Sequence, residues 1–171
     1  IATRYVATNH VLSMGVDLLW RQRVVQLVSE WKPERLLDLA TGTGDLALAI
    51  LRAMPEIRLT GSDFCQPMLD VAAERGLTNL VCADAMNLPF PSASYDAVTV
   101  AFGLRNMASY PDALKEMGRM LRPGGHLLIL DFSLPENLLK RPYRFYLHRI
   151  LPLIAGWTVS YTHLTLPTNR E

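Results

Sequence analysis

The sequence predicts an α/β fold in which a doubly wound, mostly parallel sheet carries helices on both faces. Two observations lead to this prediction. Strand-like and helix-like segments alternate along the chain, which is typical of repeated βαβ units. Acidic or small residues also lie at or just past the ends of the strand-like segments, where ligands bind in such sheets. These residues are Asp38, Asp63, Asp84, Ala101 and Asp131.

The expected elements follow in order from a helix at residues 17–31, whose apolar residues recur at helical spacing and form a core-facing stripe. That stripe consists of Trp20, Val24, Leu27 and Trp31. Pro33 ends the helix. Strands are predicted at 35–40, 57–62, 80–83, 95–101 and 126–132, and helices at 46–51, 65–75 and 112–121. A Pro-Gly-Gly run at 123–125 predicts a tight turn with positive φ before the last strand.

Composition narrows the class of protein. The chain has 171 residues, which is enough for one domain with a sizeable core. Its net charge of +1 gives no reason to expect a nucleic-acid partner. No apolar run approaches the roughly 20 residues that span a bilayer, and the first residues do not resemble a signal peptide. Because the chain does not begin with Met, we expect that its native start is missing.

No metal site is predicted. The four histidines form no cluster in the sequence, and the spacing of Cys65 and Cys82 fits neither a zinc site nor a redox motif. Both cysteines are therefore expected to be small buried residues in a reducing, cytoplasmic setting.

A glycine-rich loop follows the first predicted strand. Gly42-Thr43-Gly44 precedes a helix, which is the layout used to bind nucleotide-type cofactors. Asp38, just before the loop, would repel a pyrophosphate but suits the ammonium group of an amino-acid moiety, as in S-adenosyl-L-methionine. The run also satisfies the dinucleotide pattern G-x-G-x-x-G/A, and Asp63 lies 21 residues after Gly42, where an acid binds ribose hydroxyls. Both cofactor types therefore stay open on these residues alone.

Further motifs carry a family resemblance. Asp84, after the third strand, is placed to accept a hydrogen bond from an adenine amino group, and this set of residues resembles the class I S-adenosylmethionine-dependent methyltransferases. The segment 5–20, the run Phe102-Gly103-Leu104-Arg105-Asn106 and the segment 119–133 resemble the ubiquinone/menaquinone biosynthesis C-methyltransferases more specifically. This resemblance covers nearly all of residues 4–157. Val6, Thr8, Asp17, Ala101 and Asp131 depart from the residues usual in that family.

The resemblance implies a Rossmann-like fold, of which this chain would lack the last two strands. It also implies methyl transfer from S-adenosyl-L-methionine to a ring carbon of a polyprenylated quinol. The implied cofactor contacts are Thr43, Asp63, Asp84 and Ala85. Asp38, Gly42 and Gly44 complete that pocket on the charge and turn arguments above. Arg105 and Asn106 would face the substrate, with Tyr5 closing over it.

Arg105 is interpreted as a cation that stabilises a phenolate, since its pKa above about 12 keeps it from acting as a base. A structural salt bridge is the alternative for this side chain. Three alternatives stay open for the whole protein: an O- or N-methyltransferase of another small molecule, an NAD-dependent oxidoreductase, and an inactive cofactor-binding fragment.

Four segments are expected along the chain. Residues 1–32 form an N-terminal helical substrate lid, 33–133 the cofactor-binding core, and 134–158 a helical segment facing substrate or membrane. Residues 159–171 resemble a translated sequencing adapter and are expected to be a non-native tail. Basic and aromatic residues interleave at 138–149, which favours either peripheral contact with a membrane surface or packing on the protein's own domain. The sequence leaves the oligomeric state open.

Overall fold

The structure is a computed structural model that describes residues 16–131. Its strands are β1 (Arg35–Leu39), β2 (Arg58–Asp63), β3 (Leu80–Cys82), β4 (Tyr95–Ala101) and β5 (Leu121–Leu130). Its helices are α2 (Val16–Trp31), α3 (Asp45–Ala53), α4 (Gln66–Glu74), the 3-10 helix η1 (Leu104–Asn106) and α5 (Tyr110–Met120). The alternation predicted from the sequence is therefore confirmed over this range.

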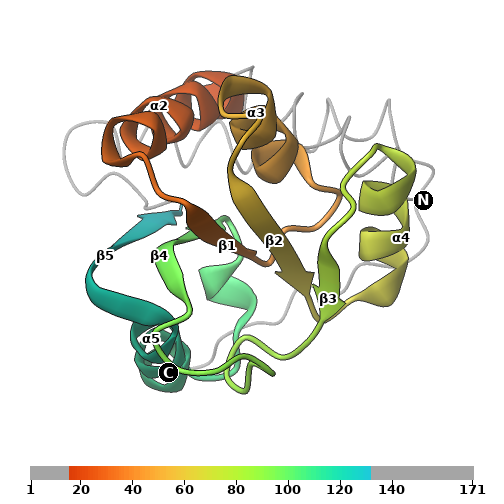
Figure 1. Ribbon diagram of the computed structural model, residues 1–171. Coiled ribbons are helices and arrows are strands. Elements are labelled where there is room, and N and C mark those ends of the chain that lie inside the picture. Colours follow the sequence, from red (N-terminus) through yellow and green to blue (C-terminus); the bar gives the residue numbers. More distant parts are fainter. Residues whose placement is uncertain (1–15, 132–171) are drawn as a thin grey trace, which may run out of the picture. The chain divides into compact units, whose positions relative to one another are not determined.

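The five strands form one sheet in the order β3-β2-β1-β4-β5, and every neighbouring pair is parallel (Figure 1). The chain moves outward from β1 to β3 and then returns to the other side of β1 to form β4 and β5. The strand order thus reverses between β1 and β4. In open α/β sheets, ligands bind beyond the carboxyl ends of the strands at such a reversal.

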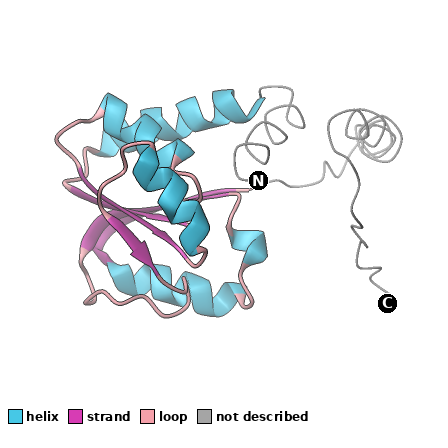
Figure 2. Cartoon of the chain, turned by 90° about the vertical axis from the view of Figure 1, so that its right-hand side faces the viewer, coloured by secondary structure: helices cyan, strands magenta, loops and turns pink. Residues whose placement is uncertain are grey.

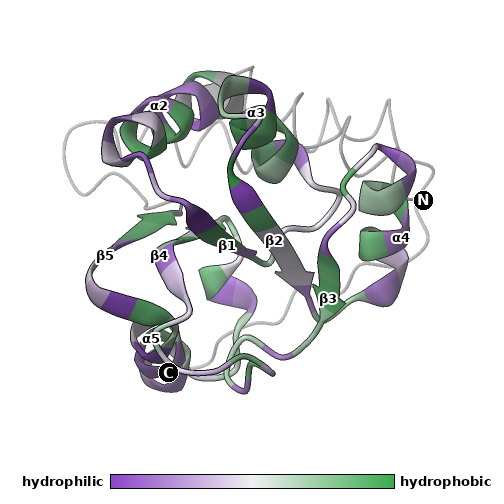
Figure 3. Cartoon of the chain, in the orientation of Figure 1, coloured by the Kyte–Doolittle hydropathy of each residue, from purple (hydrophilic) through white to green (hydrophobic). Residues whose placement is uncertain are grey.

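Helices cover both faces of the sheet, as predicted (Figure 2). Side chains alternate between the faces along a strand, so neighbouring residues of β1 enter different cores. Leu36 packs with Val28 of α2 and Ile50 of α3, whereas Leu37 packs with Met117 of α5. All of these side chains are essentially inaccessible to solvent. Along α2 hydrophilic and hydrophobic residues alternate, as expected of a helix with one buried face (Figure 3).

Some local predictions were wrong. The stripe of α2 is centred on Val24 and Val28, while Trp20 is 37% exposed. The last strand begins at Leu121 because the Pro-Gly-Gly run is a bulge inside β5, with Gly124 at φ +81°. Cys65 is half-buried and Cys82 is exposed, since β3 is the outer strand of the sheet.

Several predictions fall on residues that the structure does not describe. Tyr5 and the segments 134–158 and 159–171 lie outside the described residues, as does the first half of the predicted lid at 1–32. Within residues 16–131, no helix is long and apolar enough to cross a membrane.

Candidate active site

The carboxyl ends of the strands bring the predicted site residues together from distant parts of the sequence. The loop after β1 meets Asp63 at the end of β2, where the backbone N–H of Gly42 donates to the Asp63 carboxylate at 2.9 Å. Arg105, after β4, reaches Asp131, after β5, at 3.1 Å. One edge of the sheet therefore carries both the predicted cofactor residues and the predicted substrate residues.

The glycine-rich loop turns sharply between β1 and α3. Gly42 and Gly44 adopt φ values of +56° and +80°, which only glycine adopts at little cost, and Gly44 stands at the N-terminus of α3. The Gly44 N–H donates to the carbonyl of Thr41 at 2.9 Å. Thr43 is buried, and its hydroxyl lies 3.5 Å from the Asp45 carboxylate. The backbone bond from Gly44 to Thr41 thus closes the turn.

Asp38 supports this loop from within the core. Its side chain accepts hydrogen bonds from the hydroxyls of Thr41, at 2.7 Å, and Thr99, at 2.6 Å, and the residue is only 2% exposed. Burial raises the pKa of Asp38 from 3.8 to about 6, although the two hydroxyl bonds oppose that change. Because both oxygens already accept bonds in the core, the predicted contact with an ammonium group stays a prediction.

Asp63 is also held firmly. Its two oxygens accept bonds from the backbone N–H groups of Gly42 and Cys65, each at 2.9 Å, and the residue is 7% exposed. A carboxylate oxygen has a second lone pair, so this orientation still allows Asp63 to accept from a ligand hydroxyl. The aromatic side chain of Phe64, next to it, is 74% exposed.

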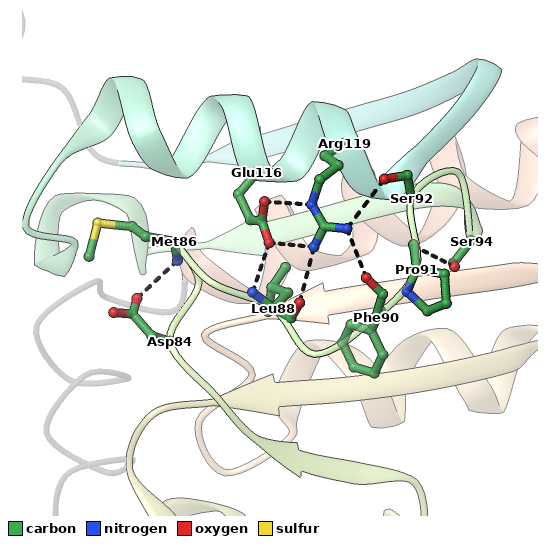
Figure 4. A network of polar contacts seen from close by, with 9 residues as sticks. All are labelled: Asp84, Met86, Leu88, Phe90, Pro91, Ser92, Ser94, Glu116 and Arg119. Atoms are coloured by element: carbon green, nitrogen blue, oxygen red, sulfur yellow. Dashed lines mark hydrogen bonds and ion pairs between the residues drawn. The ribbon is translucent and has the colours of Figure 1, made fainter.

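Asp84 lies at the start of a loop that α5 holds in place (Figure 4), and Ala85 follows it in the sequence. The Asp84 carboxylate accepts from the Met86 N–H at 2.9 Å. Further along, Glu116 accepts from the Leu88 N–H at 2.8 Å, and Arg119 donates to the carbonyls of Leu88, at 3.0 Å, and Phe90, at 2.8 Å.

Glu116 and Arg119 also pair with each other at 2.6 Å. The Arg119 bond lowers the pKa of Glu116, so the carboxylate stays charged. The loop that carries Asp84 is therefore fixed to α5 by charged side chains.

Arg105 and Asn106 are exposed neighbours in η1. The Arg105 guanidinium pairs with Asp131, and 43% of its side chain is exposed. The backbone of this segment packs closely on the glycine-rich loop, because a Cβ on Gly103 would overlap the Cβ of Ala40. Both Ala40 and Phe102 adopt positive φ, at +50° and +58°. The segment that leads into the predicted substrate residues thus packs on Ala40, at the start of the loop that carries the predicted cofactor residues.

Sequence reasoning missed two features of this edge. Phe64 could have been found from the sequence, since it is a large aromatic residue directly after a predicted strand and the acidic Asp63. Arg75 could not, because it donates to the carbonyl of Thr43 from 32 positions along the chain.

Comparison with known proteins adds independent information. The model of the ubiE/COQ5 methyltransferase family matches residues 1–164. A protein of Thermus thermophilus named demethylmenaquinone methyltransferase is 48% identical over 162 residues, covering 91% of this chain and 74% of that protein. A protein of Geotalea daltonii named ubiquinone/menaquinone biosynthesis C-methyltransferase UbiE is 41% identical over 165 residues, covering 91% and 70%.

Solved structures share the fold. The [4+2]-cyclase SpnF superimposes with a TM-score of 0.59 and 33% identity over 67% of this chain. The match spans 46% of the SpnF chain. A cyclase on this fold is a reminder that the fold alone does not determine the reaction. The identity of the chain therefore rests on the family match.

Proposed function

Because the chain belongs to the ubiE/COQ5 methyltransferase family, we propose that it methylates a ring carbon of a polyprenylated quinol. The methyl donor is S-adenosyl-L-methionine, and the acceptor is a demethylmenaquinol or a methoxy-polyprenyl-benzoquinol. The observation that carries this proposal is the close approach of Gly103, in the segment that bears Arg105, to Ala40, at the start of the loop that leads into Gly42–Gly44. Family membership also sets aside an NAD-dependent oxidoreductase.

The residues at the strand ends fit this donor. The fixed carboxylate of Asp63 suits two ribose hydroxyls, and the exposed carboxylate of Asp84 suits an adenine amino group. Phe64 offers an exposed aromatic face on which an adenine ring can stack. The bound donor supplies an electrophilic methyl group on a sulfonium.

Arg105 meets the main chemical requirement of the methyl acceptor, which is stabilisation of a phenolate on the quinol. A quinol ring carbon is a weak nucleophile until an adjacent hydroxyl loses its proton, and a phenol with a pKa near 10 resists this at pH 7 by about 4 kcal/mol. The partly exposed guanidinium of Arg105 would stabilise the phenolate. Asp131 orients that guanidinium, and water or a carboxylate takes the proton. Asn106, beside it, offers a further polar contact to the quinol.

The membrane is part of this proposal because a polyprenyl chain partitions into lipid. Peripheral contact through residues 138–149, on a protein that otherwise works in the cytoplasm, remains a prediction from the sequence. Tyr5 is likewise proposed to close over the quinol.

Transfer of a labelled methyl group to each of the two quinols tests the proposed activity. We expect at least one quinol to become labelled, and Arg105→Ala to lower kcat by about a hundredfold, since electrostatic groups of this kind typically contribute that much. The affinity of the variant for S-adenosylhomocysteine should change less than about twofold. A large loss of that affinity would contradict the assignment of Arg105 to the quinol. If the native chain labels neither quinol, the proposed reaction is wrong.

A further inference from the structure

Arg75, directly after α4, bridges two parts of the glycine-rich loop. One of its guanidinium nitrogens donates to the carbonyl of Thr43 at 2.7 Å, and the other pairs with the carboxylate of Asp45 at 2.7 Å. Thr43 lies in the loop and Asp45 is the first residue of α3. A single side chain thus spans the turn from loop to helix.

The carbonyl of Thr43 is the backbone group of the loop that Arg75 binds. The N–H of Gly42 donates to Asp63 at the end of β2, which ties the loop to the sheet, and the N–H of Gly44 donates to Thr41 within the loop. Arg75 adds a bond to the loop from the end of α4. A Cβ on Gly44 would meet Ala72 of α4 at 3.3 Å, so the loop also packs directly on that helix.

Asp45 extends the contact to a third element. Its carboxylate lies 3.5 Å from the guanidinium of Arg21 on α2, in addition to its bond with Arg75. The Asp45 side chain is 20% exposed and the Arg75 side chain is 36% exposed, so the pair is partly open to solvent. An isolated exposed ion pair contributes little to stability. The guanidinium of Arg75, however, binds a carbonyl and a carboxylate at once, as the forked shape of an arginine allows.

We propose that Arg75 is a positioning residue that sets the affinity for S-adenosyl-L-methionine by holding the glycine-rich loop in its binding conformation. The inference rests on the proposed function, because it assigns the loop to that cofactor. Arg75 acts through Thr43 and Asp45. Without it, the loop would have to be ordered when the cofactor binds, which lowers affinity and leaves the chemistry of the bound complex unchanged.

The test compares Arg75→Ala and Arg75→Lys with the native chain by calorimetry with S-adenosylhomocysteine, and by the kinetics of methyl transfer. We expect Arg75→Ala to weaken binding about tenfold, which corresponds to the loss of one charged hydrogen bond. KM for the methyl donor should rise in parallel, while kcat at saturating donor stays within about twofold. A lysine lacks the forked guanidinium and reaches only one acceptor. The affinity of Arg75→Lys should therefore lie between that of the native chain and that of Arg75→Ala.

Two further variants separate this role from general stability. Arg52→Ala removes an arginine from the last turn of α3 and should leave affinity unchanged. Asp45→Asn should weaken binding less than additively with Arg75→Ala, because the two residues share one interaction. All measurements are made below the onset of unfolding of each variant.

The outcomes are distinguishable. An unchanged affinity in Arg75→Ala, or an equal loss in Arg52→Ala, overturns the inference while the proposed function stands. A fall in kcat with unchanged KM also overturns it. A native chain that does not bind S-adenosylhomocysteine overturns the proposed function itself, and the inference with it.

Discussion

At the scale of single residues, the burial of Asp38 makes the stability of the protein depend on pH. Its pKa rises from 3.8 to about 6 on folding, chiefly because burial disfavours the charged form. The folded chain therefore binds this proton more tightly than the unfolded chain. The stabilising contribution of this carboxyl is present below about pH 4 and is lost as the pH rises through about 6.

Asp38→Asn should remove this pH dependence. An asparagine can still bond to the hydroxyls of Thr41 and Thr99 but does not titrate. We expect the free energy of unfolding of the variant, relative to the native chain, to rise by roughly 2–3 kcal/mol between pH 4 and pH 7. Urea unfolding of both proteins across this range measures the difference. Parallel stability curves would show that folding leaves the pKa of Asp38 unchanged.

At the scale of elements, Gly103 controls how closely the segment after β4 approaches the loop after β1. Its own φ is −99°, so an alanine there would be strained only by contact with Ala40 and Val100. We expect Gly103→Ala to destabilise the protein by about 1–3 kcal/mol, the usual cost of overpacking, and to lower both cofactor affinity and kcat. Thermal unfolding and methyl-transfer kinetics measure these effects.

Two variants make this prediction specific. Ala40→Gly removes the opposing Cβ and suits the φ of +50° at that position, so the double variant should recover most of the lost stability. Gly118→Ala in α5 meets nothing within 4 Å and should be neutral or slightly stabilising. If Ala40→Gly fails to restore Gly103→Ala, the two loops are not coupled through this contact.

The helices and strands also differ in how well the sequence predicts them. Buried runs such as 35–39 and 95–101 are unmistakable, because parallel strands are covered on both faces and need continuous apolar residues. Starts were harder. Helix α5 begins at Tyr110 and is capped by Ser109, which accepts from the Asp112 N–H at 3.4 Å. That Ser-x-x-Asp signal was readable, whereas the bulge that lets β5 begin at Leu121 depends on its pairing with β4.

At the scale of the whole molecule, the sequence predicts which residues lie at the strand ends, but it does not predict the hydrogen-bond partners of those residues. The positions of Asp63 and Asp84 follow from strand order along the chain. The bonds that fix the site do not: Thr99 reaches Asp38 across 61 positions, and Arg75 reaches Thr43 across 32. Such contacts are created by tertiary packing, so no local pattern reports them. The family resemblance supplied Arg105, and its pairing with Asp131 became visible only in the sheet.

Binding of a cofactor across β1, β2 and β3 should stabilise the folded chain as a whole. A ligand that binds only the folded state adds about 2.7 kcal/mol at a hundredfold excess over its Kd. For a domain of this size, that raises Tm by roughly 5–10 °C. We therefore expect S-adenosylhomocysteine to raise Tm in proportion to the logarithm of its concentration, while NAD leaves it unchanged.

Arg75→Ala provides the internal comparison for this experiment. Its weaker affinity should shift the dependence of Tm on ligand concentration to about tenfold higher concentrations without changing the slope, because the slope reflects one bound ligand per chain. An equal rise with NAD would return the glycine-rich loop to the dinucleotide-binding class. The absence of any rise with S-adenosylhomocysteine would mean that the residues at the strand ends do not form a working cofactor site in this chain.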